Sequence, residues 1–395
     1  SLYLITMYIT RRQLEKNSKT IAVQSTQMFK SLQEGLGGIR EVLLHQAQKF
    51  YCKIYRDADI PVRKAYANSD FIGGSPKYAI EALGMILVAA LAYSMTNQSD
   101  HPFGAIPVLA AFALGAQRLL PTLQQSYLSY TTMKRSTSSF EDVIVLLEQP
   151  LPMYLDELTY DETFFEKSIV FDNVSFRYSD ESPLVLKDIN FQINKGDRVG
   201  IVGPTGSGKS TLLDVLMGLL PPTDGSIVID GEILNNENIR LWQSNISHVP
   251  QNVFLFDSSI DENIAFGVPS EKINQKRLLE ASKKAQIDKF VDSWSKKYKT
   301  IIGENGVKLS GGQRQRIGIA RALYKKSKVL VFDEATNALD NKTEQNVIKS
   351  IEEADEKATI LMIAHRLTTL KNCNKIIELN SENDLKETTY DEIYK

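Results

Sequence analysis

The chain has 395 residues, enough for two domains of ordinary size that each bury their own core. Charged residues make up 24% of it and the formal net charge is -2, which excludes a global electrostatic attraction to nucleic acid or to an acidic partner. Its two cysteines, Cys52 and Cys373, lie far apart and match no metal-ligand spacing, which argues against a disulfide framework or a zinc site and favours a reducing compartment.

The first seventy residues predict long helices. The apolar start, Ser1–Ile5, lacks the basic residues and the cleavage site of a signal peptide, and we expect the chain to begin inside a helix. Further on, up to residue 70, Lys, Arg, Gln and Glu recur at helical spacing, with interruptions at Gly35, Gly37 and Gly38. This pattern is typical of solvated helices.

Residues 81–118 predict an apolar helical hairpin. No Lys, Arg or Glu lies between Glu81 and Arg118, and residues 97–102 mark its tip. Each arm is near the lower limit of about 18–20 residues for a bilayer span, so two membrane helices and a buried soluble hairpin both fit the hydropathy. Lys and Arg concentrate before the hairpin and are absent from its tip, which favours membrane helices with the basic side in the cytoplasm. The expected spans are about 78–97 and about 103–133.

Glu81 and Arg118 are equally far from this tip, about 27 Å at 1.5 Å per residue, and therefore lie at matching depth. Two interpretations stay open. Either both side chains reach toward the cytoplasmic interface, or they form a functional pair on a polar path for a substrate.

The helical pattern continues after the hairpin and ends at Pro150 and Pro152. Residues 151–166 are rich in Asp and Glu and predict a linker. Over residues 167–395 short β-rich runs alternate with helical ones, which predicts an α/β domain with a partly parallel sheet. The clearest strand candidates are residues 169–171, 198–202 and 328–332.

A phosphate-loop motif directly follows the second of these strand candidates and directly precedes a helical run. It consists of Gly203, Pro204, Thr205, Gly206, Ser207, Gly208, Lys209, Ser210 and Thr211. Its glycines let backbone N–H groups surround phosphates, Lys209 reaches the β- and γ-phosphates, and the Ser210 hydroxyl can bind Mg²⁺. A chance match is the alternative, and the flanking strand and helix argue against it. The motif predicts a nucleoside-triphosphate site.

Asp333 and Glu334 follow the third strand candidate. A carboxylate at such a strand end can hold Mg²⁺, and its neighbour can orient or deprotonate a water that attacks the γ-phosphate. Without the phosphate loop, two solvated acids would be the ordinary interpretation. Beside that loop they predict hydrolysis, with Asp333 at the metal and Glu334 as the catalytic residue.

A second glycine-rich element begins another helix and consists of Leu309, Ser310, Gly311, Gly312 and Gln313. Ser and Gly at the start of a helix form an anion-binding surface. Together with the phosphate loop and the acidic strand end, this LSGGQ sequence closely resembles the ATPases of the ATP-binding-cassette (ABC) superfamily. The resemblance implies that LSGGQ caps the ATP held by the opposite subunit.

Four further positions match motifs of this family. The resemblance implies that Tyr178 stacks on adenine, although a core tyrosine would be the default interpretation if it stood alone. It also implies that Gln251 binds Mg²⁺ and senses the attacking water. It places Asp340 in the D-loop and gives His365, which alone would more often be structural, a contact with the γ-phosphate. Lys209, Gln251, Glu334 and His365 are then the expected catalytic set.

The likeness is strongest to exporters that fuse a membrane part and a nucleotide-binding part in one chain. Residues 254–264 and the loop 302–306 are similar to exporter sequences, although Asn305 stands where arginine is common. The resemblance implies a coupling helix near His45–Tyr51 that docks on a partner's nucleotide-binding domain. Residues 1–150 would then be a partial membrane domain that lacks the first three helices and most of the fourth, so we expect an N-terminally truncated chain.

The family resemblance implies a half-transporter that binds ATP and Mg²⁺ and pairs with a second copy of itself or with a paralogous half-transporter. It implies a multi-pass protein of the cytoplasmic (inner) membrane, in contact with membrane lipid, with its nucleotide-binding domain in the cytoplasm and no nucleic-acid partner. Residues 71–84 are similar to flippases of lipid-linked oligosaccharides, and Arg118 would suit a lipid pyrophosphate. A general lipid, peptide or multidrug exporter stays open. So does a soluble ABC ATPase of DNA repair or translation, against which the apolar hairpin argues.

Overall fold

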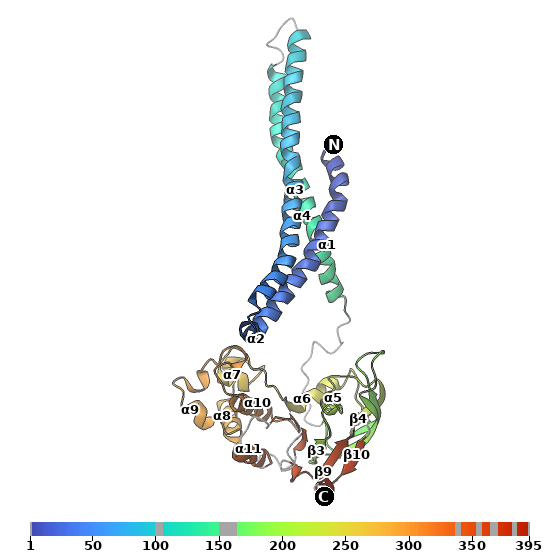
Figure 1. Ribbon diagram of the computed structural model, residues 1–395, viewed down its shortest axis with the longest axis vertical. Coiled ribbons are helices and arrows are strands. Elements are labelled where there is room, and N and C mark those ends of the chain that lie inside the picture. The colour runs from blue at the N-terminus through green and yellow to red at the C-terminus, as the bar shows by residue number, and fades with distance from the viewer. Residues whose placement is uncertain are drawn as a thin grey trace. The chain divides into compact units, whose positions relative to one another are not determined.

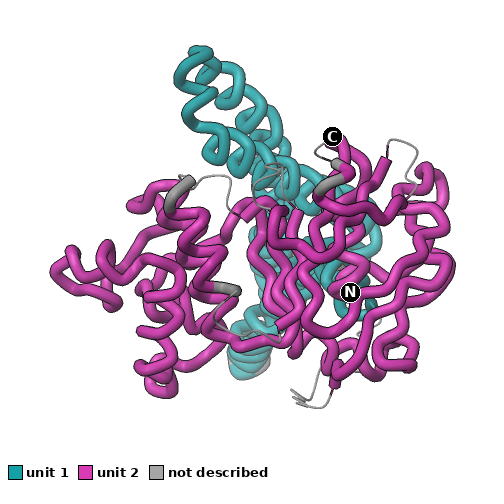
Figure 2. The backbone as a smooth tube through the Cα atoms, turned by 90° about the horizontal axis from the view of Figure 1, so that it is seen from below, with its two compact units in different colours: residues 1–150 teal, residues 151–395 magenta. Residues whose placement is uncertain are grey.

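A computed structural model describes residues 2–98, 106–149, 164–335, 341–352, 358–363, 370–380 and 385–393. The chain forms two compact units, residues 1–150 and residues 151–395, which Figure 2 shows in two colours. The first unit is helical and the second combines helices with two sheets (Figure 1).

Long helices build the first unit. Its elements are α1 (Leu2–Gly37), α2 (Ile39–Leu44), α3 (Gln48–Gln98) and α4 (Ile106–Leu147). Pro61 and Pro76 lie inside α3, and Pro121 lies inside α4. The long helices predicted within the first seventy residues are confirmed, and α4 ends shortly before Pro150, as the sequence predicts.

The turn between α1 and α3 differs from the prediction. The sequence predicts a short helix near His45–Tyr51, whereas the short helix α2 ends at Leu44 and α3 has already begun at Gln48. The Ala47 N–H donates to the Val42 carbonyl at 2.9 Å, and Gln46 adopts a left-handed φ of 53°. This closing turn ends α2 and reverses the chain into α3. The docking of the turn between α1 and α3 on a partner's nucleotide-binding domain stays a prediction.

Buried polar side chains join the helices of the first unit. The Asn17 amide donates from Nδ2 to Ser69 Oγ at 3.0 Å, which links α1 to α3. Tyr127 of α4 is fully buried, and its hydroxyl donates to the carbonyl of Ile72 in α3 at 3.1 Å. These bonds satisfy polar groups that would otherwise be costly to bury, and they fix the register of the helices.

Only α3 meets the length and composition of a membrane span among the described residues. Its stretch Gln48–Ser94 contains an 18-residue window of mean hydropathy 1.4, and none of that window is buried within the fold. The first predicted span, about 78–97, lies in this helix. The second, about 103–133, begins outside the described residues. Two spans therefore stay a prediction.

Glu81 and Arg118 are not joined by any ion pair in the part of the chain that the structure describes. Arg118 is exposed and Glu81 is half-buried. A direct pair within one chain is therefore not formed, and a role of either residue on a substrate path stays a prediction.

Two sheets build the second unit. The larger has the strand order β10-β9-β3-β8-β7-β6 and is parallel except for the pair β9 and β10. The smaller is antiparallel, with the order β2-β1-β4-β5. The strands are β1 (Ser168–Phe176), β2 (Leu186–Asn194), β3 (Arg198–Val202), β4 (Asp224–Ile229), β5 (Glu232–Ile233), β6 (Ile246–Val249), β7 (Val329–Asp333), β8 (Thr359–Ile363), β9 (Lys375–Leu379) and β10 (Leu385–Thr388).

Eight α-helices accompany the sheets in the described residues. They are α5 (Lys209–Leu216), α6 (Ile239–Ser244), α7 (Ile260–Ile264), α8 (Gln275–Lys284), α9 (Asp288–Asp292), α10 (Gly311–Lys325), α11 (Asn341–Glu352) and α12 (Tyr390–Ile393). The predicted α/β fold is confirmed, and the three strand candidates lie in β1, β3 and β7. The antiparallel sheet was not predicted.

The core of the second unit covers both faces of the larger sheet. Val329 and Val331 of β7 pack in a cluster with residues of α5 and of the smaller sheet. Leu330 and Phe332 of the same strand pack in a second cluster with residues of α7, α8 and α10. Successive side chains of a strand point to opposite faces, so β7 is apolar on both and delivers its next residue, Asp333, at the edge of the sheet.

Asp230 holds the first described residues of the second unit. Asp230, in the turn between β4 and β5, accepts hydrogen bonds from the backbone N–H groups of Glu166, Lys167 and Ser168. Burial alone would raise the pKa of Asp230, but these three donors bring it below its ordinary value. The last residues of the predicted linker therefore belong to the folded unit.

We expect Asp230→Asn to lower the free energy of unfolding by about 1–2 kcal/mol at neutral pH, because the new amide group faces a backbone N–H. The native pKa lies below the unfolded one, so the contribution of the charge is present above the unfolded pKa and is lost as the pH falls through the native pKa. The free energies of unfolding of the wild-type protein and of Asp230→Asn should therefore converge in acid. Denaturant unfolding of both proteins at pH 7 and in acid measures the difference. Glu232→Gln, on the exposed strand β5, should change neither curve. A constant gap at all pH values would contradict the prediction.

Candidate nucleotide site

The phosphate loop connects β3 to α5 in a shape that requires glycine. Gly203 has a φ of 149°, and a Cβ at this position would lie 2.3 Å from the carbonyl oxygen of Leu379, at the end of β9. Gly206 and Gly208 have φ values of 85° and 89° in the left-handed region. The sequence of glycines therefore follows from the backbone path and from the neighbouring strand.

Lys209 begins α5 and turns its ammonium group into the loop. The side chain is buried, and Nζ donates to the carbonyls of Gly203 at 3.0 Å and Pro204 at 2.8 Å. Thr205 is exposed on the outer side of the loop, whereas the Ser207 hydroxyl is buried and finds no hydrogen-bond partner among the described residues. A cation and a spare hydroxyl thus line a loop whose helix N-terminus already favours an anion.

Tyr178 lies beside the first turn of α5. Its hydroxyl is hydrogen-bonded to Thr211 Oγ1 at 2.9 Å, and its ring meets Phe176 edge-on at 5.0 Å between centroids. The side chain is 62% exposed, so it is not a core tyrosine. One face of an aromatic ring is therefore presented next to the phosphate loop, where a base can stack on it.

Asp333 and Ser210 meet at the end of β7. The Ser210 side chain lies close enough to the Asp333 carboxylate to lower its pKa by hydrogen bonding. Burial raises the pKa of Asp333, while this hydrogen bond and the nearby Lys209 act in the opposite direction. This hydroxyl and this carboxylate are hard oxygen ligands of the kind that Mg²⁺ prefers.

Glu334 and Gln251 are brought together from adjacent strands. Gln251 follows β6, which pairs in parallel with β7, and its Nε2 donates to Glu334 Oε2 at 2.7 Å. Glu334 has a left-handed φ of 49°, and its N–H donates to the carbonyl of Ile363 in β8 at 3.2 Å. The unusual backbone conformation turns the carboxylate away from the strand direction and toward Gln251.

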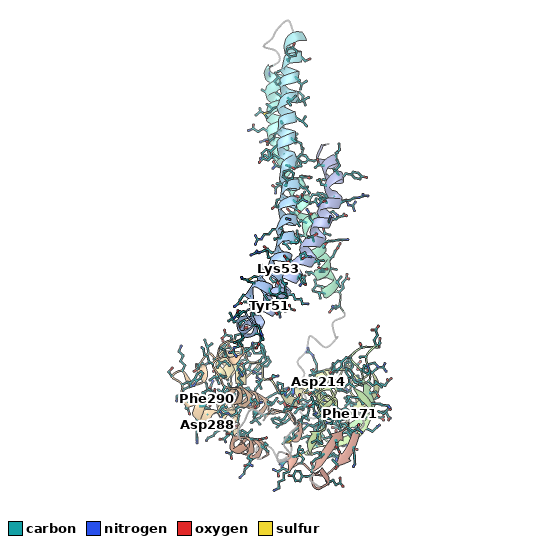
Figure 3. All side chains as sticks on the ribbon, in the orientation of Figure 1. Tyr51, Lys53, Phe171, Asp214, Asp288 and Phe290 are labelled. Carbon is teal, nitrogen blue, oxygen red and sulfur yellow. The ribbon has the colours of Figure 1, made fainter. Side chains whose placement is uncertain are left out.

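Two ionisable residues beside this site were missed in the sequence. Asp214 lies on α5 (Figure 3), and its spacing of four residues from Ser210 places it one turn later on the same face of the helix. His248 lies on β6 opposite Val331. Burial raises the pKa of Asp214 and lowers the pKa of His248, and both groups interact electrostatically with Asp333. Their spacing from Ser210 and Gln251 was the available signal, but neither residue belongs to a motif.

The LSGGQ element forms the start of α10. Ser310 Oγ accepts from the Gln313 N–H at 3.3 Å, and the Ser310 N–H donates to Gln313 Oε1 at 2.8 Å, which is a capping box. Leu309 is buried, while Gly311 and Gly312 form the first turn. In the described part of the chain no hydrogen bond or ion pair joins this element to the phosphate loop. Asp340 and His365 lie outside the described residues.

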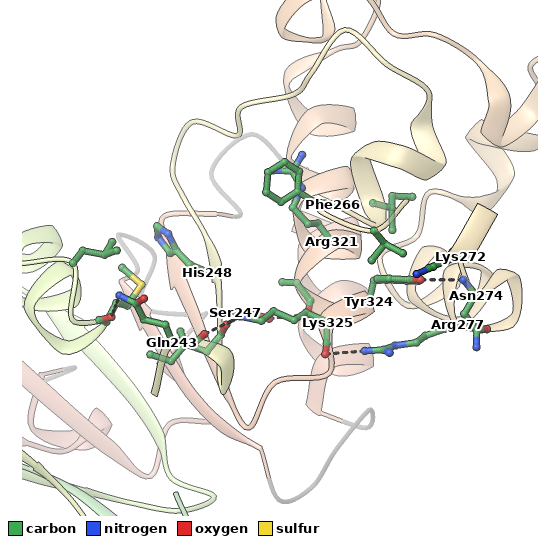
Figure 4. Close-up of a pocket in the computed structure, with 16 residues that line it drawn as sticks. Gln243, Ser247, His248, Phe266, Lys272, Asn274, Arg277, Arg321, Tyr324 and Lys325 are labelled. Atoms are coloured by element: carbon green, nitrogen blue, oxygen red, sulfur yellow. Dashed lines mark hydrogen bonds between the residues drawn. The ribbon is translucent and has the colours of Figure 1, made fainter. Parts of the chain in front are cut away.

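A separate pocket of about 690 Å³ lies between β6, α8 and α10 and includes none of the phosphate loop (Figure 4). Arg321 stacks over the ring of Phe266 at 5.1 Å, and Arg277 donates to the carbonyl of Lys325 at 2.8 Å. The charged residues that line the pocket are all Lys or Arg, and His248 also lines it. The pocket is therefore distinct from the place where the phosphate-binding groups gather.

The comparisons with known proteins agree with this geometry. The family model for ABC transporters matches residues 186–337. An ATP-dependent lipid A-core flippase of Cupriavidus metallidurans is 32% identical over 94% of this chain and 62% of its own length. A protein of the same description from Alkalilimnicola ehrlichii is 30% identical over 99% of this chain and 66% of its own length.

A leukotoxin translocation ATP-binding protein of a Pasteurella haemolytica-like species is 33% identical over 83% of this chain and 46% of its own length. The structure of a bacterial Atm1-family ABC exporter with ATP bound matches 99% of this chain and 68% of the exporter chain, with a TM-score of 0.85 and 26% identity. The chain thus spans less than two thirds of the length of the curated relatives named here. A helical N-terminal part precedes an α/β ABC ATPase domain, and the chain belongs to the ABC transporter family.

Proposed function

We propose that this chain is part of an exporter half-subunit that hydrolyses ATP to move a substrate across the cytoplasmic (inner) membrane. The observation that carries the proposal is the hydrogen bond between Gln251 and Glu334, formed beside the phosphate loop and Asp333. A polarising amide, a carboxylate and a phosphate-binding lysine at one sheet edge are the parts of a hydrolytic site. No described position of these motifs carries a substitution that would remove the chemistry.

In this proposal each residue of the site has a defined part in binding or hydrolysing the nucleotide. Lys209 exchanges its two carbonyl partners for the β- and γ-phosphates, and Tyr178 stacks on the adenine. Ser210, Asp333 and Gln251 hold Mg²⁺, which offsets phosphate charge when bound. Glu334 orients the attacking water and accepts its proton, with Gln251 fixing the carboxylate. His365 is assigned to the γ-phosphate from its motif alone.

The site is completed by a second subunit. The start of α10 presents N–H groups and the Ser310 hydroxyl as an anion-binding surface, yet it makes no hydrogen bond or ion pair with the phosphate loop among the described residues. We assign Leu309–Gln313 to the ATP held by the partner, and Asp340 to the same interface. Two ATP molecules would then lie between two such chains, in a homodimer or with a paralogous half-transporter.

A membrane setting is supported by the exposed apolar helix α3 and by the relatives described as flippases and translocation proteins. The predicted spans, about 78–97 and about 103–133, would cross the bilayer, with the nucleotide-binding unit in the cytoplasm. The rival from another class is a soluble ABC ATPase of DNA repair or translation. Recovery of the protein in the soluble fraction after cell lysis would favour that rival.

The substrate that we propose is a lipid-linked oligosaccharide or another glycolipid. Two relatives are ATP-dependent lipid A-core flippases, and residues 71–84 resemble flippases of lipid-linked oligosaccharides. Arg118 is exposed on the first unit and could pair with a phosphate of such a lipid. The relative described as a leukotoxin translocation protein keeps a peptide exporter as the second candidate.

The shape of the phosphate loop gives a first test. We expect Gly203→Ala to lose most ATP affinity, because its Cβ would lie 2.3 Å from the Leu379 carbonyl. Gly206→Ala is the matched control: it also has a positive φ, but its Cβ would meet nothing within 4 Å. Titration with a fluorescent ATP analogue compares them. Equal losses in both variants would contradict the assigned loop shape.

Glu334→Gln tests the catalytic assignment. The amide keeps the size of the side chain but cannot accept a proton, so we expect ATP to bind while turnover falls about 100- to 10,000-fold. Phosphate release and sedimentation with ATP measure turnover and the expected ATP-dependent dimer. Glu271→Gln, an exposed carboxylate outside the site, should leave both unchanged. Retained turnover in Glu334→Gln would rule out the proposed role.

The substrate is tested by ATPase stimulation in reconstituted membranes that contain the complete gene product. We expect polyprenyl-pyrophosphate sugars or lipid A-type glycolipids to raise turnover several-fold, because bound substrate favours the closed dimer. Glu334→Gln in the same vesicles reports hydrolysis by contaminants. Stimulation by peptides, without a response to either glycolipid class, would replace the glycolipid proposal by a peptide exporter.

A further inference from the structure

The helix that carries the phosphate loop is held at its far end by α6. Trp242 of α6 is fully buried, and its Nε1 donates to the carbonyl of Leu216, the last residue of α5, at 2.7 Å. Gln243 adds a bond from Nε2 to the Gly218 carbonyl at 3.2 Å. The last carbonyls of a helix have no partner inside it, so these side chains complete the C-terminal end of α5.

The contact between α5 and α6 leaves little room for adjustment. Gly218 has a φ of 66°, and a Cβ at this position would lie 2.9 Å from Cγ1 of Ile239, the first residue of α6. The eight residues of α5 form a rod about 12 Å long between the phosphate loop and Trp242. If phosphate binding at the start of α5 shifts this helix along its axis, the shift changes the contacts of the indole ring at its other end.

The other side of Trp242 faces the start of the second unit. Phe165 meets the indole edge-on, with 5.7 Å between ring centroids, and is itself fully buried. Phe165 has a left-handed φ of 73°, a conformation that a residue with a large side chain keeps only when its surroundings impose it. Lys328 imposes it in part, because its Nζ donates to the carbonyls of Phe164 and Phe165 at 3.2 Å.

These contacts form one chain of support from Phe165 through Trp242 to the end of α5. We propose that Trp242 is a positioning residue for the nucleotide site, and that it couples occupancy of the phosphate loop to the packing of Phe164 and Phe165, the first described residues of the second unit. The coupling is reciprocal: ATP at the loop changes the environment of Trp242, and a change at Phe165 alters the affinity for ATP. The inference rests on the proposed function and deepens it by naming a regulatory contact of the same site.

A first experiment observes the indole directly in the complete gene product labelled with 5-fluorotryptophan. The ¹⁹F resonance of Trp242 is assigned by its loss in Trp242→Phe, and Trp294, which packs edge-on against Phe290 at 5.3 Å, serves as an internal reference. We expect saturating ATP to move the Trp242 resonance and to leave that of Trp294 in place. An unmoved Trp242 resonance, with ATP binding confirmed by a fluorescent analogue, would overturn the proposal.

A second experiment separates positioning from stability. Trp242→Phe keeps an aromatic ring but loses the indole N–H that donates to the Leu216 carbonyl. We expect this variant and Phe165→Leu to raise the ATP KM about three- to tenfold, with kcat changed by less than about twofold. Phe191→Leu is the matched control, because it loses a stacked contact with Phe171 at 4.3 Å in the same core cluster but touches neither α5 nor α6 through that contact. Thermal unfolding of all three shows whether their stability losses are comparable.

The double variant of Phe165 and Trp242 decides whether the two act on one path. We expect its KM to be close to that of the more affected single variant, because each substitution interrupts the same support. Strictly multiplied effects, or a KM increase of the same size in Phe191→Leu, would overturn the proposal. If the unaltered protein binds no ATP, the proposed function itself fails, and that result is distinct from both of these.

Discussion

Everything in the nucleotide site depends on the parallel alignment of β3, β8, β7 and β6. Parallel strands place all their carboxyl ends at one edge, and the ends of β3, β7 and β6 continue into residues that the proposed chemistry needs. The phosphate loop follows β3, Glu334 follows β7 and Gln251 lies two residues beyond β6. Segments far apart in the sequence thus meet without any long-range motif, because the ladder of hydrogen bonds fixes their order.

The charges at this edge are balanced by position. Lys209 lies inside the loop that follows β3, at the N-terminus of α5, where the helix dipole already adds positive potential. Asp333 ends β7, which β8 separates from β3, and Glu334 follows it. Burial disfavours the charge of Asp333, and the hydrogen bond from Ser210 restores part of it. A site of this kind attracts phosphate on one side and a metal ion on the other, which suits a bound nucleotide and its cation together.

The sequence was most informative where a buried strand ends directly in a motif. The strand candidate 198–202 coincides with β3, and the candidate 328–332 begins and ends one residue before β7. Both agree closely because an apolar run and the motif that follows it indicate the same boundary. Ser310 was expected at a helix start and is the N-cap of α10. These features are local, and local spacing is what a single sequence records.

The rest depended on contacts across the fold. The sheet β2-β1-β4-β5 was not predicted, because the pairing of its strands depends on tertiary packing that no motif in the sequence records. A short helix was expected near His45–Tyr51, whereas α2 ends at Leu44. Gln46 adopts a left-handed conformation that could not be predicted from its residue type. Asp214 and His248 were missed for a similar reason: neither belongs to a motif, and their proximity to Asp333 arises in the folded domain.

The close approach of Gly203 to the Leu379 carbonyl has a consequence for biosynthesis. In the finished sheet β3 lies between β8 and β9, which come from residues 359–379. While a ribosome is still translating that stretch, β3 has neither of its neighbouring strands, and the phosphate loop lacks its contact with the end of β9. A nascent chain can therefore possess every residue of its phosphate loop and still lack the pocket, which closes only when β9 has left the exit tunnel.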